Sequence, residues 1–425
     1  MILTMVVLAF GLLLVGFPIW LVFLVTSVVV INIFTTVPMA VVPSTLFGTL
    51  DNIVLLAVPG FIFAGTVMER GGMTGRLIRW VRSLVGPIPG GLSLTTIGAG
   101  GLFGAITGSS PAATAALGQV LYPALRDHGY SEKFGLGLIA STGGIAIIIP
   151  PSIAMILYSS VTGAPVGELF LAGFLPGTLL CVLVGSYAVY VSYREGVAQR
   201  SLWDWKEIFD STKSALWTLG LPVIIFGGIY GGFTTPTEAS VLASFYALFI
   251  SGIIYRELGW KTLWSITLDS AALTSKIFLI TASAGLFSWL LTISQVPQAL
   301  VGFIDSSGMP PWGILLMINV LLLLAGMFID PTSNILVLTP ILWPLAQALG
   351  LDVIHFGIIM VVNMAIGMFS PPFGLNLFVM CSVMRVSADK IAASVVPFFV
   401  IYLAGLLLIS FVPAISLYLP ALLGF

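Results

Sequence analysis

Two short polar stretches interrupt strongly apolar parts of this sequence, and their residue types could bind ions. Residues 107–110 are Thr-Gly-Ser-Ser, and residues 330–334 are Asp-Pro-Thr-Ser-Asn. Hydroxyl, amide and carboxylate oxygens are the ligands that small hard cations prefer. A helix that starts at such a stretch also points its free N–H groups and positive dipole end at it, which favours an anion. Each stretch could therefore help to hold a cation and a carboxylate side by side.

Two further interruptions contain proline pairs. They lie in STGGIAIIIPPSIAM at 141–155 and in NMAIGMFSPPFGLNL at 363–377. Proline removes a backbone donor and opens the preceding helical turn, so carbonyl oxygens become free to bind a cation such as Na⁺. None of the four stretches contains Lys or Arg. A bound anion would therefore depend on helix dipoles, hydroxyl groups and a bound cation, which makes cation coupling a requirement of binding.

The predicted site draws on all four interruptions, through side-chain or backbone oxygens. Its candidate substrate-binding residues are Thr107, Ser109, Ser110, Ser152, Asn334 and Asn376. Its candidate Na⁺ ligands are Ser109, Ser110, Thr142, Gly143, Gly144, Pro150, Asp330, Thr332, Ser333, Asn363, Gly367, Ser370 and Pro371.

Single residues among these also have a purely structural explanation. Ser and Thr in membrane helices often bond to the preceding turn, and Gly and Pro are common there. Asp330 is the only acid within a tip, so it is a functional candidate, but it could equally cap the helix that follows. Glu238 follows a proline at a helix start, which favours capping over a proton relay. The four interruptions taken together favour the functional explanation.

The composition indicates an integral membrane protein. Of the 425 residues, 59% are hydrophobic and 7% are charged, whereas soluble domains carry about a quarter charged residues. A net charge of −1 without a basic stripe excludes nucleic acid as a partner. The two Cys and two His are isolated, so they predict no metal site, and each His is expected in a loop or an interface. The apolar N-terminus lacks a basic region and a cleavage site, which predicts a span instead of a signal peptide.

Apolar stretches define an all-α polytopic fold. Stretches long enough to cross a membrane lie at 2–16, 18–34, 50–68, 135–163, 167–193, 214–232, 236–255, 275–293, 353–384 and 391–412. The first two could also be one kinked helix. Two further regions, 88–125 and 311–349, are too long for one crossing and rich in helix breakers, so they are expected to be re-entrant helical hairpins. The spans broken at the proline pairs are expected to be two broken helices.

The basic residues predict the orientation. Threading these spans places fourteen of the fifteen Lys and Arg on one side, which the positive-inside rule makes cytoplasmic. The exception, Lys276, would lie at the inner end of a span, where its side chain can reach the surface. The segment 74–86 is amphipathic and is expected to lie in the membrane interface, as an arm that braces a scaffold or as an ordinary linker. The segment 295–307 is its equivalent in the second half.

A shift of 221 residues aligns the two halves of the sequence without a gap. It superposes the two polar tips, the two proline pairs and several further positions: Pro123 on Pro344, Gly129 on Gly350, Glu168 on Asp389 and Pro176 on Pro397. An odd number of predicted crossings separates the equivalents, so the repeats are expected to be inverted. Inverted repeats with broken helices are typical of secondary transporters, whose sites lie near the middle of the bilayer.

Several motifs resemble the DctM-type large membrane subunit of tripartite ATP-independent periplasmic (TRAP) transporters. They are GAITGSSPAATAALG, GLIASTGGIAIIIPPSIAMILY, VGELFLAGFLPG, GGFTTPTEAS and HFGIIMVVNMAIGMFSPPFGLNLFV, and the resemblance covers essentially the whole chain. It implies a Na⁺-coupled importer of organic acids in the bacterial inner membrane, with sialic acid or a C4-dicarboxylate as the expected substrate. It also implies two partners, a periplasmic substrate-binding protein and a separate small four-helix membrane subunit. The implied Na⁺ sites lie at the hairpin tips and broken spans.

The fold that this resemblance implies is an elevator-type transporter related to divalent-anion/sodium symporters. The expected domains are a scaffold with the first arm at 1–86, a transport-domain half at 87–163, a scaffold with the second arm at 164–308, a second transport-domain half at 309–384 and a C-terminal scaffold helix at 385–425. The first hairpin would gate the cytoplasmic side, and the second hairpin would gate the periplasmic side.

Other functions fit the sequence less well. A stand-alone sodium/anion symporter, which needs no binding protein, is the nearest alternative. An ion channel would need a pore-lining ring and would not need paired hairpins. An enzyme would need a catalytic constellation inside the bilayer, and a primary pump would need a phosphate-binding loop. The sequence has neither of these motifs, so secondary transport without enzyme activity is expected.

Overall fold

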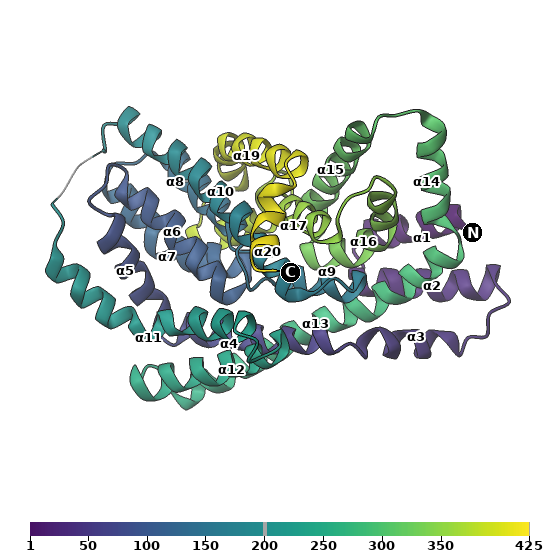
Figure 1. Ribbon diagram of the computed structural model, residues 1–425, viewed down its shortest axis with the longest axis horizontal. Helices are drawn as coiled ribbons and strands as arrows, with labels where there is room; N and C mark the ends of the chain where they lie inside the picture. Colours follow the sequence, from purple (N-terminus) through teal and green to yellow (C-terminus); the bar gives the residue numbers. More distant parts are fainter. Residues whose placement is uncertain (199–201, 425) are drawn as a thin grey trace.

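The computed structural model describes residues 1–198 and 202–424, with the side chains of 303–305 and 307 left out of the description. The described residues form helices joined by turns, and they contain no β-strand (Figure 1). A helix satisfies its own backbone hydrogen bonds without water, so an apolar chain in a bilayer favours it. The predicted all-α fold class is confirmed.

Seven described helical segments are long and apolar enough to cross a membrane, so the chain is a multi-pass membrane protein. They are η1 with α4 (Ile53–Leu56 and Ala57–Arg70), α10 (Val166–Arg194), α11 (Trp205–Tyr230), α12 with η2 (Pro236–Phe249 and Ile250–Ile254), α13 (Trp260–Ile293), α15 (Pro311–Phe328) and α19 (Ala388–Phe411). Shorter apolar helices are α1 (Ile2–Leu14), α2 (Ile19–Phe34), α3 (Val41–Leu50), α6 (Gly91–Thr107), α9 (Ile153–Thr162), α17 (Val353–Phe369) and α18 (Leu375–Met384). The others are α5 (Met73–Val85), α7 (Ser110–Asp127), α8 (Glu132–Ile145), α14 (Val296–Ser307), α16 (Pro331–Ala348) and α20 (Ala414–Leu422).

Two helical hairpins occupy the regions predicted for them. Helices α6 and α7 form the first hairpin, and α15 and α16 form the second. Gly108 ends α6 with a φ of +58°, a conformation that glycine adopts without a steric penalty. Pro111 then lies in the first turn of α7, where its missing N–H is not needed. In the second hairpin, Pro331 starts α16 after Asp330 has capped it.

The proline pairs interrupt two helices as predicted. Helix α8 ends before Pro150-Pro151 and the chain resumes as α9, while α17 ends before Pro371-Pro372 and resumes as α18. The first interruption spans residues 146–152 and the second spans residues 370–374. Non-helical backbone groups therefore lie between α8 and α9 and between α17 and α18.

The two halves of the chain have matching helix boundaries. Helix α7 spans 110–127 and α16 spans 331–348, so both ends differ by 221 residues. Contacts between the halves are reciprocal, because α7 packs against α18 while α16 packs against α9. Where α8 crosses α17, a Cβ on Gly144 would lie 3.0 Å from the carbonyl oxygen of Ala365, its own equivalent in the second half. Contact between equivalent residues is typical of a two-fold interface.

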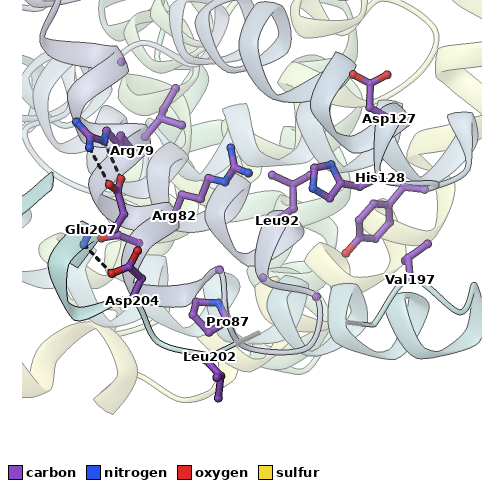
Figure 2. A pocket seen from close by; sticks show the side chains of 17 residues that line it. Arg79, Arg82, Pro87, Leu92, Asp127, His128, Val197, Leu202, Asp204 and Glu207 are labelled. Carbon is purple, nitrogen blue, oxygen red and sulfur yellow. Dashed lines mark hydrogen bonds and ion pairs between the residues drawn. The ribbon is translucent and has the colours of Figure 1, made fainter. Parts of the chain in front are cut away.

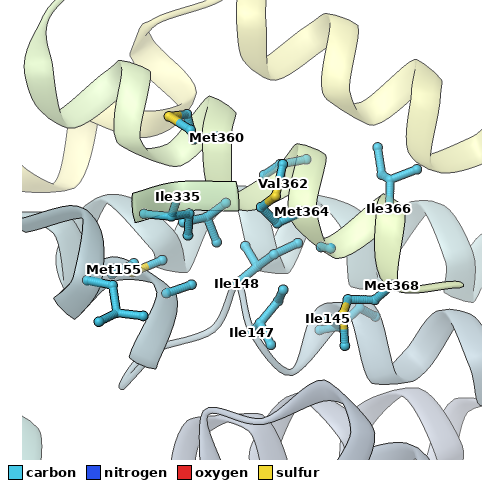
Figure 3. Packing of buried hydrophobic residues seen from close by; sticks show 14 of the residues in the cluster. Ile145, Ile147, Ile148, Met155, Ile335, Met360, Val362, Met364, Ile366 and Met368 are labelled. Atoms are coloured by element: carbon cyan, nitrogen blue, oxygen red, sulfur yellow. The ribbon is translucent and has the colours of Figure 1, made fainter. Parts of the chain in front are cut away.

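The interior where the halves meet is apolar. Figure 3 shows Ile148 and Met155 of the first half beside Ile335, Val362 and Met364 of the second half, and all five are buried. In a membrane, close packing contributes more to helix association than exclusion of water does. These contacts hold the first proline break and the second hairpin against α17.

Helices α10 and α19, which the sequence assigned to scaffold segments, pack mainly against other parts of the molecule. The sequence assigned α10 to a scaffold segment at 164–308 and α19 to another at 385–425. In the structure α10 packs along α6, α17, α19 and α20, and α19 packs along α8, α17 and α18. Both helices therefore lie with the hairpins and broken helices, because their buried faces complete that core. Only part of α10 reaches the predicted scaffold, where Phe174 packs against Phe226 of α11 with ring centroids 5.0 Å apart.

Some helix ends also differ from the predicted spans. Helices α1 and α2 are separate, α3 was not predicted, and α20 follows the last predicted span. Helix α3 contains proline and glycine and has no buried residue, so its sequence carries no periodic signal; it forms along α13. Helix α13 begins at Trp260 instead of residue 275, which places Lys276 inside the helix and not near its end.

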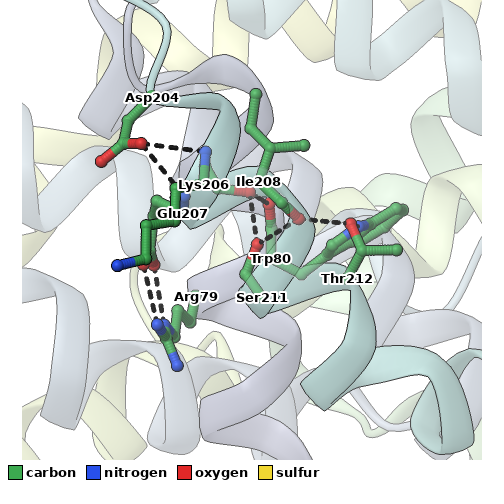
Figure 4. A network of polar contacts seen from close by, with 9 residues as sticks. Arg79, Trp80, Asp204, Lys206, Glu207, Ile208, Ser211 and Thr212 are labelled. Atoms are coloured by element: carbon green, nitrogen blue, oxygen red, sulfur yellow. Dashed lines mark hydrogen bonds and ion pairs between the residues drawn. The ribbon is translucent and has the colours of Figure 1, made fainter.

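The predicted surface helix at 74–86 is α5, and it is fastened to α11. Arg79 donates two hydrogen bonds of 2.7 Å to the carboxylate of Glu207 (Figure 4). Trp80 donates from Nε1 to Oγ1 of Thr212 at 3.1 Å. Helix α5 also packs against α6. It therefore contacts both α11 and the first hairpin, and its role as a bracing arm stays a prediction.

Candidate ion and substrate site

The tip of the first hairpin contacts the second broken helix. Ser110, the first residue of α7, donates from Oγ to Oδ1 of Asn376 at 3.0 Å, and Nδ2 of Asn376 lies 2.8 Å from the same Oγ. That Nδ2 also donates to the carbonyl oxygen of Ala140 in α8 at 3.1 Å. Ser110 and Asn376 are both buried. One amide group thus joins the hairpin tip to both broken helices.

The same tip also lies against the first proline break. A Cβ on Gly108 would lie 2.7 Å from the carbonyl oxygen of Pro151 and 3.5 Å from Cα of Ser152. Gly143 approaches from α8, and a Cβ there would lie 2.8 Å from Nδ2 of Asn376. The structure therefore brings predicted residues from three of the four interruptions together around one tip.

The tip of the second hairpin is closed by its own side chains. Asp330 accepts from the backbone N–H of Ser333 at 3.1 Å and from the Ser333 hydroxyl at 2.6 Å. Asn334 donates from Nδ2 to the carbonyl oxygen of Ile329 at 2.9 Å. The capping role that the sequence allowed for Asp330 is present. Its role as an ion ligand stays a prediction, and the two roles are compatible.

Asn363, in the middle of α17, is held by a second buried amide. Its Nδ2 donates to Oδ1 of Asn319 in α15 at 2.7 Å and to the carbonyl oxygen of Ile359 at 2.8 Å. Asn319 in turn donates to the carbonyl oxygen of Leu315 at 3.1 Å. Because each amide nitrogen bonds to a backbone carbonyl, neither amide can be turned around without losing that bond. Oδ1 of Asn363 consequently points away from both carbonyls.

Two further residues, Ser410 and His355, extend this chain of polar contacts. Of the residues in the chain, only Asn363 was among the predicted site residues. Asn319 donates to Oγ of Ser410 in α19 at 3.2 Å, and Nε2 of His355 lies 3.3 Å from the carbonyl oxygen of Ser410. His355 lies in the interface between α17 and α19, which fits the sequence expectation for it. A signal was available, because polar side chains inside apolar helices are costly and therefore informative.

Four predicted site residues carry buried oxygen atoms without a hydrogen-bond partner among the described residues. These atoms are Oγ1 of Thr142, Oγ of Ser152, Oδ1 of Asn334 and Oδ1 of Asn363. A buried polar atom without a partner costs about 1–3 kcal/mol. Each of the four lies at a tip, at a break or in a helix that leads to a break, and Thr142 and Asn363 are equivalents in the two halves. Oxygen atoms of this kind suit a bound cation.

Three helices start at these interruptions without a side-chain cap. They are α7 after Ser109, α9 after Ser152 and α18 after Gly374. Helix α16 differs, because Asp330 caps it. Uncapped first-turn N–H groups and the positive end of the helix dipole suit a carboxylate. Cation-binding and anion-binding groups are therefore both present around the first tip.

The remaining predicted residues make more ordinary contacts. The hydroxyls of Thr107 and Ser370 donate to carbonyl oxygens of the preceding helical turn, at 3.1 Å and 2.6 Å. Gly367 allows α17 to approach α15, because a Cβ there would lie 2.5 Å from the carbonyl oxygen of Gly326. The others lie in the tips, the breaks or the adjoining turns: Ser109, Gly144, Pro150, Thr332 and Pro371.

A cavity of about 990 Å³ lies apart from these residues, at the base of the first hairpin. Figure 2 shows Arg82 of α5, Asp127 and His128 at the end of α7, and Asp204 and Glu207 at the start of α11 around it. None of the predicted site residues lines this cavity. Its lining carries more acidic than basic side chains, with Asp127, Asp204 and Glu207 against Arg79 and Arg82, so it does not define a site for an anion.

Helical hairpins, broken helices and buried polar groups between them are features of membrane transporters. Comparison with known proteins agrees with this class. The structure of the Alcanivorax borkumensis YdaH transporter has a similar fold, with a TM-score of 0.63, 14% sequence identity, and coverage of 87% of this chain and 86% of that chain. At this identity the similarity concerns the fold alone.

The chain belongs to the DctM family of TRAP transporters. The family model described as the DctM component of the tripartite ATP-independent periplasmic transporter matches residues 6–415. The C4-dicarboxylate TRAP transporter large permease protein DctM of Pseudomonas aeruginosa is 41% identical over 383 residues, which is 89% of each chain. The ectoine TRAP transporter large permease protein TeaC of Halomonas elongata is 39% identical over 366 residues, which is 86% of each chain. The chain is thus a transporter subunit and not an enzyme.

Proposed function

We propose that this chain is the large permease of a TRAP transporter that imports an organic acid together with Na⁺. Its family membership supports the transport of organic acids. The Na⁺ coupling is supported chiefly by one observation, the buried oxygen atoms without partners at Thr142, Ser152, Asn334 and Asn363. Na⁺ is here a co-transported ion, and it would supply the partner that these oxygen atoms lack.

The substrate carboxylate would bind at the first hairpin tip. Helices α7, α9 and α18 start there without side-chain caps, and no Lys or Arg belongs to the tip or the breaks. Ser110 and Asn376 supply further polar groups between the halves. Relatives with similar identity are named for different substrates, so a C4-dicarboxylate is the first compound to test and sialic acid the second.

The transport movement would be an elevator motion of one packed group against another. The moving group would contain both hairpins, both broken helices, α10 and α19, because these helices pack together. The fixed group would contain α2, α3, α4, α11, α12 and α13, braced by α5. The matching helix boundaries and reciprocal contacts support repeats related by a two-fold axis in the membrane plane, as in other transporters of this kind.

The complete system would have two more proteins. A small membrane subunit and a periplasmic binding protein belong with this permease family, and the bacterial inner membrane is the expected location. A stand-alone symporter is the alternative, since the site itself needs no binding protein.

The test is uptake of labelled succinate or N-acetylneuraminate into proteoliposomes. The vesicles contain this chain with its small subunit, and the cognate binding protein is added outside. We expect uptake only with both an inward Na⁺ gradient and the binding protein. Uptake with Na⁺ but without the binding protein would support the stand-alone symporter instead. Uptake that is equally fast without Na⁺ would contradict the role proposed for the oxygen atoms.

Two variants link the result to the site. Ser152→Ala removes an unpartnered hydroxyl at the first break and is expected to raise the Na⁺ concentration for half-maximal uptake. Ser27→Ala is a matched control, because Ser27 is also buried and without a partner but lies in α2. Equal effects of the two substitutions would mean that the Ser152 hydroxyl has no special role in coupling.

A further inference from the structure

A groove of about 470 Å³ lies between the ends of three helices, away from the hairpin tips. It is formed by the start of α8, the end of α10 and the first part of α19. On the sequence topology, this is the side that carries nearly all Lys and Arg. Its walls are partly aromatic, with Phe134, Tyr187 and Phe398 in mutual contact at centroid distances of 5.3 to 6.3 Å.

The rim of the groove carries a net positive charge, because Lys133 and Arg194 outnumber its one acid, Glu195. Lys133 and Arg194 both line it and are exposed, and neither has an ion-pair partner among the described residues. The acid on the rim, Glu195, is already engaged. Its two carboxylate oxygens accept from the hydroxyl of Ser131 at 2.6 Å and from the backbone N–H of Ser131 at 3.0 Å. These donors are neutral, so Glu195 keeps its charge, and the groove presents two cations without ion pairs and a net charge of +1.

The groove also runs from the membrane surface toward the hydrocarbon. Arg194 is the last residue of α10, and Tyr187 lies two turns deeper in the same helix, a rise of about 10 Å. Tyr190 and Tyr193 of the same helix are exposed, and tyrosine is enriched at the level of lipid headgroups. A ligand with a charged head and an apolar tail matches this gradient from cationic rim to aromatic wall.

We propose that this groove binds an anionic phospholipid of the cytoplasmic leaflet. The lipid phosphate would lie between Lys133 and Arg194, and the first part of an acyl chain would lie along Tyr187 and Phe398. Basic pockets between helices on the cytoplasmic side commonly bind anionic headgroups, because each nearby Lys or Arg strengthens binding about fivefold. This site is separate from the proposed transport site and does not depend on it.

Native mass spectrometry of the full chain tests the proposal. The protein is titrated with phosphatidylglycerol and, separately, with phosphatidylcholine, and the two dissociation constants are compared. We expect tighter binding of phosphatidylglycerol by the natural protein. The double variant Lys133→Gln/Arg194→Gln should lose about thirtyfold of this preference, because it removes both charges. The double variant Lys133→Arg/Arg194→Lys should keep it.

Controls separate this site from general charge effects. Lys206→Gln/Lys213→Gln removes the same charge from exposed positions of α11 and should leave the preference unchanged. Binding of phosphatidylcholine should be the same for all variants, which shows that they are folded. An unchanged preference in Lys133→Gln/Arg194→Gln would overturn the proposal. Displacement of phosphatidylglycerol by millimolar inorganic phosphate would also overturn it, because the ligand would then be a soluble anion.

Discussion

At the scale of single residues, the orientation of one buried amide has a chemical consequence. Asn363 directs its oxygen away from Asn319 because both amide nitrogens bond to backbone carbonyls. An amide oxygen can bind a cation, whereas an amide nitrogen cannot. Asn319 is thus a positioning residue: it fixes the group that we propose to bind Na⁺ without binding the ion itself.

Substitution Asn319→Ala tests this role. It removes one of the two acceptors for Nδ2 of Asn363 and leaves the carbonyl oxygen of Ile359, so the amide oxygen is held less firmly toward the site. We expect about a tenfold increase in the Na⁺ concentration for half-maximal uptake, with a smaller change in the maximal rate, since one such hydrogen bond is worth about 1 kcal/mol or somewhat more. Ser416→Ala is the control, because this buried residue lies in α20. An unchanged Na⁺ dependence would contradict the positioning role.

Substitution Gly108→Ala tests the close approach at the first tip. The new Cβ would lie 2.7 Å from the carbonyl oxygen of Pro151, at a residue with a φ of +58°. Gly163→Ala is a matched control, because its φ is +75° but nothing lies within 4 Å of the new Cβ. Both variants should lose about 1–2 kcal/mol of stability from the left-handed conformation. Only Gly108→Ala should also lose most uptake; equal uptake in both variants would show that the contact with Pro151 is dispensable.

Residue types predicted the site only in part. Ser110, Ser152, Asn363 and Asn376 were selected because polar groups in interrupted apolar helices are unusual. Asn319 was missed because it lies within an uninterrupted helix, α15, and its role appears only when α15 and α17 are packed together. A contact of this kind joins side chains from two different helices. The spacing of residues along the sequence does not show which helices will pack together.

At the scale of elements, α5 is held by apolar packing more than by its ion pairs. Three of its own apolar side chains, Leu77, Ile78 and Val81, are buried. Arg79 and Glu207 form a bidentate pair, but their side chains are 51% and 39% exposed. Pairs this exposed contribute little to stability and are weakened by salt. The apolar face should therefore dominate the attachment of the arm.

A comparison of two substitutions measures this difference. Leu77→Ala should lower the free energy of unfolding by about 2–4 kcal/mol, the usual cost of truncating a buried leucine. Arg79→Gln keeps the apolar face and should leave stability close to that of the natural protein. Denaturant unfolding in detergent micelles gives both values. A larger loss for Arg79→Gln than for Leu77→Ala would mean that the ion pair is the main attachment.

Elements with strong local signals were predicted well, and elements without them were not. Gly108, Asp330 and the two proline pairs stop or start helices by local chemistry, through the backbone or a side-chain cap, so the hairpins and breaks were found. Helix α3 was missed because it contains Pro43 and Gly48 and lacks a clear apolar period; in the structure it lies along α13. The packing of α10 against α6 and α17 was not predicted, since hydropathy marks a span but does not say what the span packs against.

At the scale of the whole molecule, the two halves share one interface. Gly144 contacts its own equivalent Ala365, and the hairpin of each half packs on the broken helix of the other. An inverted arrangement would expose equivalent positions on opposite sides of the membrane.

Cysteine labelling tests this arrangement. Asp127 and Ala348 are exposed equivalents at the ends of α7 and α16. Each is replaced by cysteine in a background with Cys181→Ser and Cys381→Ser, and a membrane-impermeant maleimide is applied to either side. We expect Asp127→Cys to react only from the cytoplasmic side and Ala348→Cys only from the periplasmic side. Reaction of both from the same side would show that the repeats are parallel.

The length of α13 sets the height at which the membrane surface crosses the protein. Its 34 residues extend about 51 Å, whereas the hydrocarbon layer is about 30 Å thick. Fitting the whole helix inside would need a tilt of about 54°, beyond the usual range of 0–40°. The part after Lys276 is about 26 Å long and nearly fills the layer. We therefore expect Lys276 to mark the water boundary on the basic side. The first half of α13, including the Asp269 that pairs with Arg70 at 2.8 Å, would then stand beyond it among headgroups and water.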